Sequence, residues 1–204
     1  MTKSPNLAFE KSLWARGCIN IAGIDEVGRG SWAGPVVAAA VILSKSFEIP
    51  DGFGESKQVK PQARKKLSQY IKIHAKAFSI AEVPVSMINN HGIGYASQVA
   101  FRKAVRQLDP RPDYILIDAF YIKHLNRKNQ KAIIKGDEKC ASIAAASVIA
   151  KVYRDDLMRM LAKKYPQYLF GKHKGYGTKL HQGLIRENGF SKIHRTSFNL
   201  KFLS

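Results

Sequence analysis

The sequence predicts an α/β protein built on one sheet. Five apolar runs of strand length alternate with amphipathic helical patterns, and three of the runs end in an acidic residue. Strands and helices that alternate along a chain favour a layered α/β domain. The chain has 204 residues, 45% of them hydrophobic, so we expect a single domain over residues 1–204.

The first half of the chain supplies three of the expected strands. Residues 1–19 form an amphipathic lead-in, and strands are expected at the ranges 20–25, 36–43 and 77–83. A loop with proline and glycine covers residues 47–59. Pro61 suits the first position of a helix over 62–75, and a second helix is expected over 95–108. Residues 86–94 are expected to form a turn-rich connector.

The second half adds two strands and the longest helix. Strands are expected at 113–118 and 132–134, on either side of a basic loop over 123–131. The helix over 140–165 begins with small residues, which would let it pack close to a sheet. Asp155 and Asp156 within it could face a metal, although ion pairs on an exposed helix face are the preferred interpretation. A last helix over 181–188 is capped by Gly189.

The acidic residues are few, and their positions are informative. Of fifteen, most lie in polar or glycine-rich stretches and are expected to be solvated, Glu10 among them. Asp25, Glu26, Asp118 and Asp137 instead lie where apolar strands end. Carboxylates at the carboxyl edge of a sheet can hold a hard cation, and a solvated turn is the alternative. Asp25 and Glu26 could share one ion only if the chain leaves strand geometry between them.

The glycine-rich turn after these acids fits a dinucleotide fingerprint only superficially. Residues 28–33 match the pattern G-x-G-x-x-A, which requires a helix to begin at the glycines. Gly34 and Pro35 interrupt that helix, and a second apolar strand follows. We therefore interpret the turn as a place where the backbone approaches a ligand closely.

The charge of the chain selects a class of partner. Lys and Arg number 34 against 15 Asp and Glu, which gives a formal charge of +19. Such an excess favours a polyanion, with nucleic acid as the leading candidate and ribosomal or membrane-surface binding as alternatives. No secretory leader or bilayer-spanning segment is evident, and Cys18 and Cys140 match no metal or disulfide spacing. A cytoplasmic location is expected.

A second glycine-rich segment lies at residues 172–178. It combines basic residues with Tyr176 and two glycines, a composition that suits contact with phosphate and stacking on a sugar or base. An ordinary turn with a solvated tyrosine is the alternative. The six histidines are scattered along the sequence, and we interpret each as structural or phosphate-facing.

Taken together, these motifs resemble the ribonuclease HII family over nearly the whole chain. The matching blocks, in the family's order, are Gly23–Gly30 with Ala33–Val37, Leu116–Asp118, Lys135–Asp137, Ala144–Val152 with Arg154 and Asp155, and His173–Thr178 with His181. Several separate blocks in one order are far more specific than any single motif.

The resemblance implies the fold and the activity. The fold is a ribonuclease H-like mixed five-stranded sheet flanked by helices, with a helical C-terminal segment at about 166–204 that contacts substrate. The first three strands are antiparallel, and the fourth and fifth are parallel to the first. The implied enzyme is a phosphodiester hydrolase, a metal-dependent endoribonuclease. It cleaves the RNA strand of RNA–DNA hybrids and cuts 5′ of single ribonucleotides in duplex DNA, leaving 3′-hydroxyl and 5′-phosphate ends. The implied roles are the removal of ribonucleotides from DNA (ribonucleotide excision repair) and of RNA primers.

The resemblance also implies the site. Asp25, Glu26, Asp118 and Asp137 would be the catalytic metal ligands. Oxygen ligands favour Mg²⁺ or Mn²⁺, and two ions would serve an in-line displacement. Gly28, Arg29 and Gly30 would contact the ribose 2′-hydroxyl and the RNA-to-DNA junction. Tyr176 would stack on the following deoxyribose, while Lys57 and Lys174 would contact phosphate or nearby substrate.

Two departures from the family pattern and two rival functions accompany this reading. Glu55 replaces an aspartate before Ser56 and Lys57, and Ala119 replaces the glycine that usually follows the third acid.

The rival functions are a non-catalytic basic nucleic-acid-binding protein and another ribonuclease H-like enzyme, such as a junction resolvase or a type that needs longer ribonucleotide runs. A monomer is expected, and contact of the C-terminal tail with a sliding clamp is left open.

Overall fold

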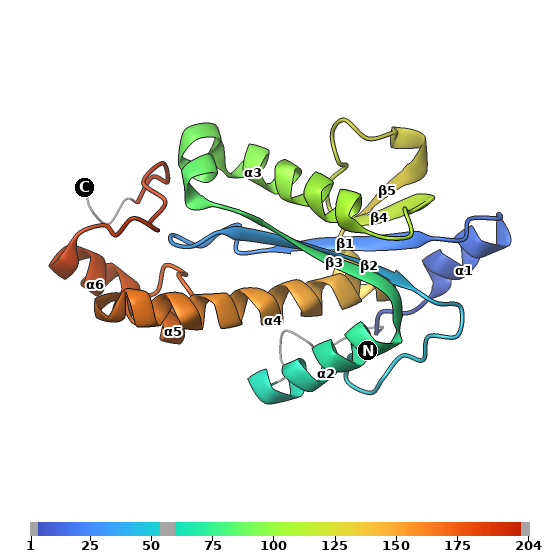
Figure 1. Cartoon of the computed structure of the whole chain (residues 1–204), viewed down its shortest axis with the longest axis horizontal. Coiled ribbons are helices and arrows are strands. Elements are labelled where there is room, and N and C mark those ends of the chain that lie inside the picture. The colour runs from blue at the N-terminus through green and yellow to red at the C-terminus, as the bar shows by residue number, and fades with distance from the viewer. Residues whose placement is uncertain (1–3, 54–59, 201–204) are drawn as a thin grey trace.

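The computed structural model of the chain describes residues 4–53 and 60–200 (Figure 1). Its elements in chain order are α1 (Ala8–Ala15), β1 (Ile21–Val27), β2 (Val36–Leu43), α2 (Pro61–His74), β3 (Ala75–Val83), α3 (Val85–Gln107), β4 (Tyr114–Asp118), η2 (Arg127–Asn129), β5 (Gln130–Ile133), η3 (Gly136–Glu138), α4 (Ala141–Lys164), η4 (Pro166–Tyr168), α5 (Phe170–His173) and α6 (Lys179–Asn188). The described chain thus has all five expected strands.

The strands form one mixed sheet in the order β3-β2-β1-β4-β5. β1 pairs antiparallel with β2, and β2 pairs antiparallel with β3. β4 pairs parallel with β1, and β5 pairs parallel with β4. The topology implied by the family resemblance is therefore confirmed.

Helices cover both faces of the sheet (Figure 1). On one face, apolar residues of α3 pack against β1 to β4. On the other face, the small residues of α4 pack against β2, together with α2. At Gly23 a Cβ atom would lie 2.1 Å from the backbone carbon of Ser142, so only glycine lets α4 approach β1 this closely. The small-residue half of the long helix has the role that its composition predicted.

One expected element is wrong. Residues 86–94 are not a connector, because α3 already begins at Val85. Gly92, with φ of 80°, interrupts the helical geometry and joins two helical pieces across a kink. The glycines at 92 and 94 indicated a turn, but packing of Ile88 into the core keeps the preceding residues helical.

The expectation that Glu10 is solvated is also wrong. Glu10 is fully buried where α1 meets the start of α4. Its Oε1 accepts hydrogen bonds from the Ser142 amide at 2.8 Å and from the Cys140 thiol at 3.1 Å. Amides at a helix N-terminus lack partners within the helix, so a carboxylate from another element can satisfy them.

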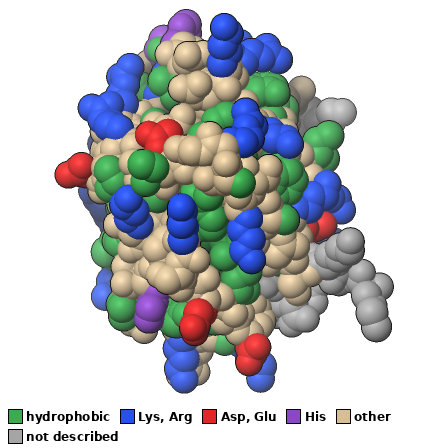
Figure 2. Space-filling model, turned by 90° about the vertical axis from the view of Figure 1, so that its right-hand side faces the viewer, with side chains coloured by type: hydrophobic (Ala, Val, Ile, Leu, Met, Phe, Trp, Pro, Cys, Tyr) green, Lys and Arg blue, Asp and Glu red, His purple; other side chains and the backbone are tan. Residues whose placement is uncertain are grey.

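The basic character of the chain is visible on the surface. The end of the molecule at the right of Figure 1 carries more Lys and Arg side chains than acidic ones (Figure 2). Among the described helices, none combines the length and the apolar character that a bilayer span requires. The surface charge is consistent with the polyanionic partner that composition predicted.

Candidate active site

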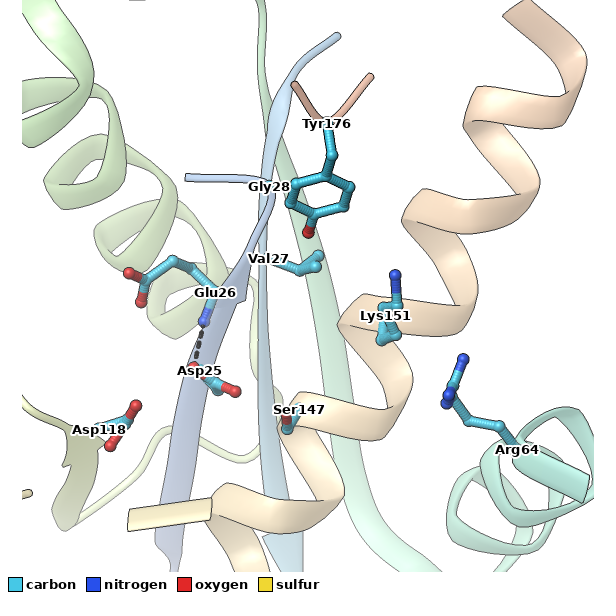
Figure 3. Close-up of a pocket in the computed structure, with 9 residues that line it drawn as sticks. All are labelled: Asp25, Glu26, Val27, Gly28, Arg64, Asp118, Ser147, Lys151 and Tyr176. Carbon is cyan, nitrogen blue, oxygen red and sulfur yellow. Dashed lines mark hydrogen bonds between the residues drawn. The ribbon is translucent and has the colours of Figure 1, made fainter. Parts of the chain in front are cut away.

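A cavity of about 350 Å³ lies where β1 and β4 end (Figure 3). β1, β4, α2, α4 and the segment after α5 all contribute side chains to it. Its lining residues are Asp25, Glu26, Val27, Gly28, Arg64, Asp118, Ser147, Lys151 and Tyr176. Three of the four acids predicted from the sequence therefore share one cavity.

The parallel pairing of β1 and β4 brings Asp25 and Asp118 together. Ile24 is paired with Ile117, so the next residue of each strand lies at the same edge of the sheet. Asp118 extends from the end of β4 toward β1 (Figure 3). Its Oδ1 accepts a hydrogen bond of 2.7 Å from the Gly136 amide, which links β4 to η3. The prediction that the two acids emerge at one edge is confirmed.

Asp25 is a buried carboxyl group in an unfavourable environment. Burial, together with the charges of Glu26 and Asp118, raises its pKa to about 7, although a hydrogen bond from Ser147 opposes the rise. The Glu26 amide donates to Asp25 Oδ1 at 2.8 Å. In the described part of the chain, no Lys or Arg forms an ion pair with Asp25. A cation in the cavity would therefore stabilise the charged form.

Glu26 follows Asp25 in β1, but its side chain points in a different direction from that of Asp25 (Figure 3). The break in strand geometry between the two acids is not observed, because β1 continues to Val27 in register with β2. The Glu26 carboxylate faces the Arg29 guanidinium at 3.5 Å. Burial raises the pKa of Glu26, and Arg29 opposes that rise. Both acids nevertheless line the one cavity.

The opposite wall of the cavity is basic, which sequence reasoning missed. Lys151 pairs with Asp155 at 2.8 Å, and Arg64 of α2 lies 3.8 Å from the same carboxylate. The predicted pairing of Asp155 with Lys151 is confirmed, but Asp155 is buried rather than on an exposed face. Only the i,i+4 spacing to Lys151 signalled this pair, and nothing in the sequence indicated that α2 would bring Arg64 to it.

Asp137 lies in η3, directly after the Gly136 amide that binds Asp118. It is half-exposed and is not among the described residues that line the cavity. Its place next to Asp118 in the fold is compatible with the predicted role. The role itself stays a prediction.

The glycine turn after β1 is shaped by a buried arginine of α4. Gly28 has φ of 86°, and a Cβ atom there would lie 2.1 Å from Arg154 Nε. Gly28 lines the cavity, Arg29 is half-buried beside Glu26, and Gly30 is exposed. The backbone here is close-packed on one side and open on the other. This geometry is compatible with a turn that approaches a ligand, and the ligand contact itself stays a prediction.

Two fully buried guanidinium groups hold this turn through backbone carbonyls. Arg195 donates to the Arg29 carbonyl at 2.8 Å and twice to that of Gly34, at 3.0 and 2.9 Å. Arg154 donates at 3.0 Å to the carbonyls of Ala33, Pro35 and Lys174. In the described chain neither arginine forms an ion pair with a carboxylate. Burial and the neighbouring Arg154 lower the pKa of Arg195 to about 9.

Tyr176 lies across the cavity from the acids (Figure 3). Its ring centre is 5.5 Å from Lys151 Nζ and 5.6 Å from Arg154 Cζ. Lys174 is two residues away, but its ammonium group hydrogen-bonds the Gly171 carbonyl and it is not among the described lining residues. Lys57 lies outside the described residues.

Three of the six histidines, His173, His181 and His194, meet in space although they are separated in the sequence. The rings of His173 and His181 stack with centres 4.2 Å apart, and His181 Nε2 lies 3.0 Å from His194 Nε2. Burial lowers the pKa values of His181 and His194 to about 4, so the rings are neutral at pH 7. His181 Nδ1 donates to the Tyr176 carbonyl at 3.0 Å. Residues separated by up to 21 positions meet here because α6 folds back onto α5, which no local pattern signals.

Comparison with known proteins decides the family. The family model for ribonuclease HII matches residues 22–201. The chain belongs to the ribonuclease HII family. Ribonuclease HII of Bacillus licheniformis is 51% identical over 191 residues, which cover 94% of this chain and 74% of the relative. It follows that the chain is a ribonuclease H of type HII, an enzyme that hydrolyses phosphodiester bonds.

Solved structures agree with the fold. The ribonuclease H2 of Pyrococcus horikoshii OT3 has a TM-score of 0.75 and 25% identity, covering 89% of this chain and 94% of that one. The ribonuclease HII of Archaeoglobus fulgidus, solved in complex with PCNA, has a TM-score of 0.76 and 23% identity, covering 89% and 96%. The fold implied by the sequence resemblance, a mixed five-stranded sheet flanked by helices, is confirmed.

The residues of the ribonuclease HII cavity fit a hard divalent cation. The acidic wall offers carboxylate oxygens, and no His or Cys is among the described lining residues, which favours Mg²⁺ or Mn²⁺ over zinc. Within the described chain, no group of three or more Asp, Glu, His and Cys side chains is already gathered tightly enough to hold an ion. The Glu26 carboxylate faces Arg29 instead. The carboxylates form a wall that a cation would draw together.

Proposed function

We propose that this ribonuclease HII is a divalent-metal-dependent endonuclease. It cleaves the RNA strand of RNA–DNA hybrids and cuts 5′ of single ribonucleotides in duplex DNA. One observation carries the proposal: buried Asp25 and half-buried Glu26 and Asp118 share a cavity whose other wall is basic. A negatively charged phosphate cannot approach three carboxylates without cations to offset the repulsion.

Asp25, Glu26 and Asp118, with Asp137 from η3, are the proposed metal ligands. Divalent ions bound there would activate a water molecule and stabilise the leaving 3′-oxygen. Ser147 orients the Asp25 carboxylate by a hydrogen bond. Arg29 lies against Glu26 and would be available to substrate once Glu26 turns to a cation.

The proposed substrate contacts surround this centre. Gly28, Arg29 and Gly30 would bind the ribose 2′-hydroxyl, which distinguishes RNA from DNA. Tyr176 would pack on the next deoxyribose, and Lys57 and Lys174 would contact phosphate nearby. Lys151 and Arg64, both held by Asp155, would face the scissile or a neighbouring phosphate. Residues 166–204 are thus proposed as a substrate-contacting segment of one catalytic domain.

The test is cleavage of three end-labelled duplexes in Mg²⁺: DNA with one ribonucleotide, an RNA–DNA hybrid, and plain DNA. Wild type should cut the first on the 5′ side of the ribonucleotide and cut the RNA strand of the second. Asp25→Asn should lose at least about 100-fold in rate, which corresponds to ~2.7 kcal/mol of transition-state stabilisation. Asp51→Asn, on an exposed turn, is the matched control.

The outcomes separate the alternatives. Cleavage of the hybrid alone would move the assignment to a relative that needs a longer ribonucleotide run. Binding of all three duplexes without cleavage would support the non-catalytic rival. Full activity of Asp25→Asn would contradict the proposed centre.

Other features stay proposals. A monomer in the cytoplasm is the expected form. PCNA is the partner in the Archaeoglobus fulgidus complex, and clamp contact by this chain would have to use a surface such as its tail. Phe198 of that tail packs against the core on the α3 side of the sheet, and residues 201–204 lie outside the described range.

A further inference from the structure

Two aromatic side chains are exposed immediately after the catalytic strand β4. Phe120 is 51% exposed and Tyr121 is 38% exposed. Ala119, with φ of 59°, turns the chain sharply after Asp118, and the Phe120 amide donates to the Asp118 carbonyl at 2.7 Å. This turn directs the two residues out of the sheet beside the cavity. We call Phe120 and Tyr121, with Arg29 and Arg127, the aromatic ridge.

The loop that carries the ridge is firmly held, so the exposure does not reflect a loose segment. The buried side chain of Gln130 donates to the carbonyls of Ile122, Leu125 and Asn126 at 3.2, 3.0 and 3.2 Å, and its Oε1 accepts from the Ile122 amide at 2.9 Å. From α3, Gln98 donates to the Tyr121 carbonyl at 3.0 Å and accepts from the Lys123 amide at 2.7 Å. Ile122 itself is buried. A rigid loop therefore presents two aromatic rings to solvent.

An arginine guanidinium lies over each of the two rings, Phe120 and Tyr121. The Arg29 guanidinium lies 4.9 Å from the centre of the Phe120 ring, and that of Arg127 lies 4.3 Å from the centre of the Tyr121 ring. A guanidinium that stacks on an aromatic face keeps its N–H donors at the edge, where they can bind phosphate oxygens. The aromatic rings limit the rotamers of both arginines, which lowers the entropy lost on binding.

The ridge adjoins the acidic side of the cavity, because Phe120 follows Asp118 by two residues and Arg29, which lies over the Phe120 ring, faces Glu26. It follows Asp118 directly, whereas Tyr176, Lys151 and Arg64 lie on the other side of the acids (Figure 3). In the proposed function, on which this inference rests, Tyr176 packs against the nucleotide 3′ of the ribonucleotide. A duplex that crosses the cavity would then meet the ridge on the 5′ side.

We infer that the aromatic ridge is a second binding site for nucleic acid. It binds the backbone of the cleaved strand 5′ of the ribonucleotide. Arg127 binds a phosphate, and the edges of Tyr121 and Phe120 pack against the sugars beside it. The overall charge of +19 favours this occupant over a protein surface of ordinary composition.

Binding and cleavage of a duplex with one ribonucleotide test the inference. The variant combines Tyr121→Ala and Arg127→Gln, neither of which alters a residue of the proposed centre. The matched control combines Phe78→Ala, an exposed aromatic side chain on β3, with Arg106→Gln on α3. The dissociation constant is measured by fluorescence anisotropy in EDTA over a range of salt concentrations, and KM and kcat are measured in Mg²⁺.

The ridge variant should bind about 5–10-fold more weakly, and the slope of log K against log salt should fall in magnitude by about one, as for one lost phosphate contact. KM should rise similarly while kcat stays within about twofold. The loss should nearly vanish on a duplex whose 5′ arm is cut short, and persist when the 3′ arm is shortened instead. The control variant should bind like wild type.

Several results would overturn the inference. They are equal affinity of the ridge and control variants, an unchanged salt slope, or a loss that depends on the 3′ arm. A wild type that binds without cutting would refute only the proposed activity, because the affinities in EDTA still decide whether the ridge binds nucleic acid. Circular dichroism of the double variant checks that the exposed changes leave the fold intact.

Discussion

At the scale of single residues, the site depends on which carboxylates have a cationic partner. Glu26 faces Arg29, and Asp155 faces Lys151 and Arg64, so these acids are compensated within the protein. Asp25 is buried with hydrogen bonds from Ser147 and the Glu26 amide, and its pKa rises to about 7. Its ionisation is the step that a bound cation would favour.

The pKa of Asp25 predicts how stability depends on pH without metal. The folded value of about 7 exceeds the ordinary 3.8, so the folded state binds the proton more tightly than the unfolded chain. This contribution to the free energy of unfolding is complete below about pH 4 and is lost as the pH rises to about 7; its full size is about 4 kcal/mol.

Asp25→Asn has no carboxyl group to ionise at this position, so the variant should not lose this stability as the pH rises. In EDTA the free energy of unfolding of the variant should be similar to that of wild type at pH 5. At pH 8 it should exceed the wild-type value by about 1–4 kcal/mol. Urea denaturation at the two pH values measures this. An identical difference between the proteins at both pH values would mean that Asp25 is not the strained acid of the cavity.

Sequence reasoning reached the acids of the site but not their supports. Strand-end position and scarcity of acids identified Asp25, Glu26 and Asp118, because the direction of a parallel strand fixes where its last side chain lies. Ser147, Arg64 and Lys151 reach the cavity through the packing of α4 and α2 on the sheet. That packing joins residues distant in sequence, and no local pattern records it.

At the scale of elements, the C-terminal segment fixes the turn that follows β1. Arg195 binds the carbonyls of Arg29 and Gly34, while Arg154 of α4 binds carbonyls of both glycine-rich loops. The Trp32 amide also donates to the Gly175 carbonyl at 2.7 Å. The two loops proposed to read the ribonucleotide are therefore held to each other.

This arrangement predicts the effect of a conservative change at Arg195. A lysine keeps the charge but cannot reproduce the three hydrogen bonds, so Arg195→Lys should destabilise the protein by about 1–3 kcal/mol. The kcat/KM for a duplex with one ribonucleotide should fall about tenfold or more, beyond any loss of folded protein. Arg106→Lys on α3 is the control, and steady-state kinetics below the melting temperature is the measurement.

A fall in kcat/KM that merely tracks the folded fraction would contradict the positioning role of Arg195. So would an unchanged preference for a ribonucleotide over plain deoxynucleotides combined with unchanged kinetics.

The buried contacts of Arg195 were beyond sequence reasoning, which placed Arg195 in a substrate-contacting C-terminal segment without assigning it a role. The strands and most helices could be predicted because their periodicity is local, whereas the helical stretch before Gly92 depends on tertiary packing that two glycines concealed.

At the scale of the whole molecule, charge and fold act together. A strongly basic surface attracts a polyanion, while a few acids are gathered at one edge of the sheet, where the polyanion has to be cut. The charges of Glu26 and Asp118 and the burial of Asp25 all oppose ionisation of Asp25, so the acidic edge is costly without cations. Binding of a divalent ion should therefore stabilise the entire fold.

The most direct test of the shared cation site is thermal unfolding with and without Mg²⁺ at pH 8, above the raised pKa of Asp25. Wild type should show a rise in melting temperature that grows with Mg²⁺ concentration. Asp118→Asn should show a clearly smaller rise, and Asp51→Asn, on an exposed turn, should match wild type. If all three proteins gain equally from Mg²⁺, the ion binds elsewhere and the acids at the ends of β1 and β4 do not form one site.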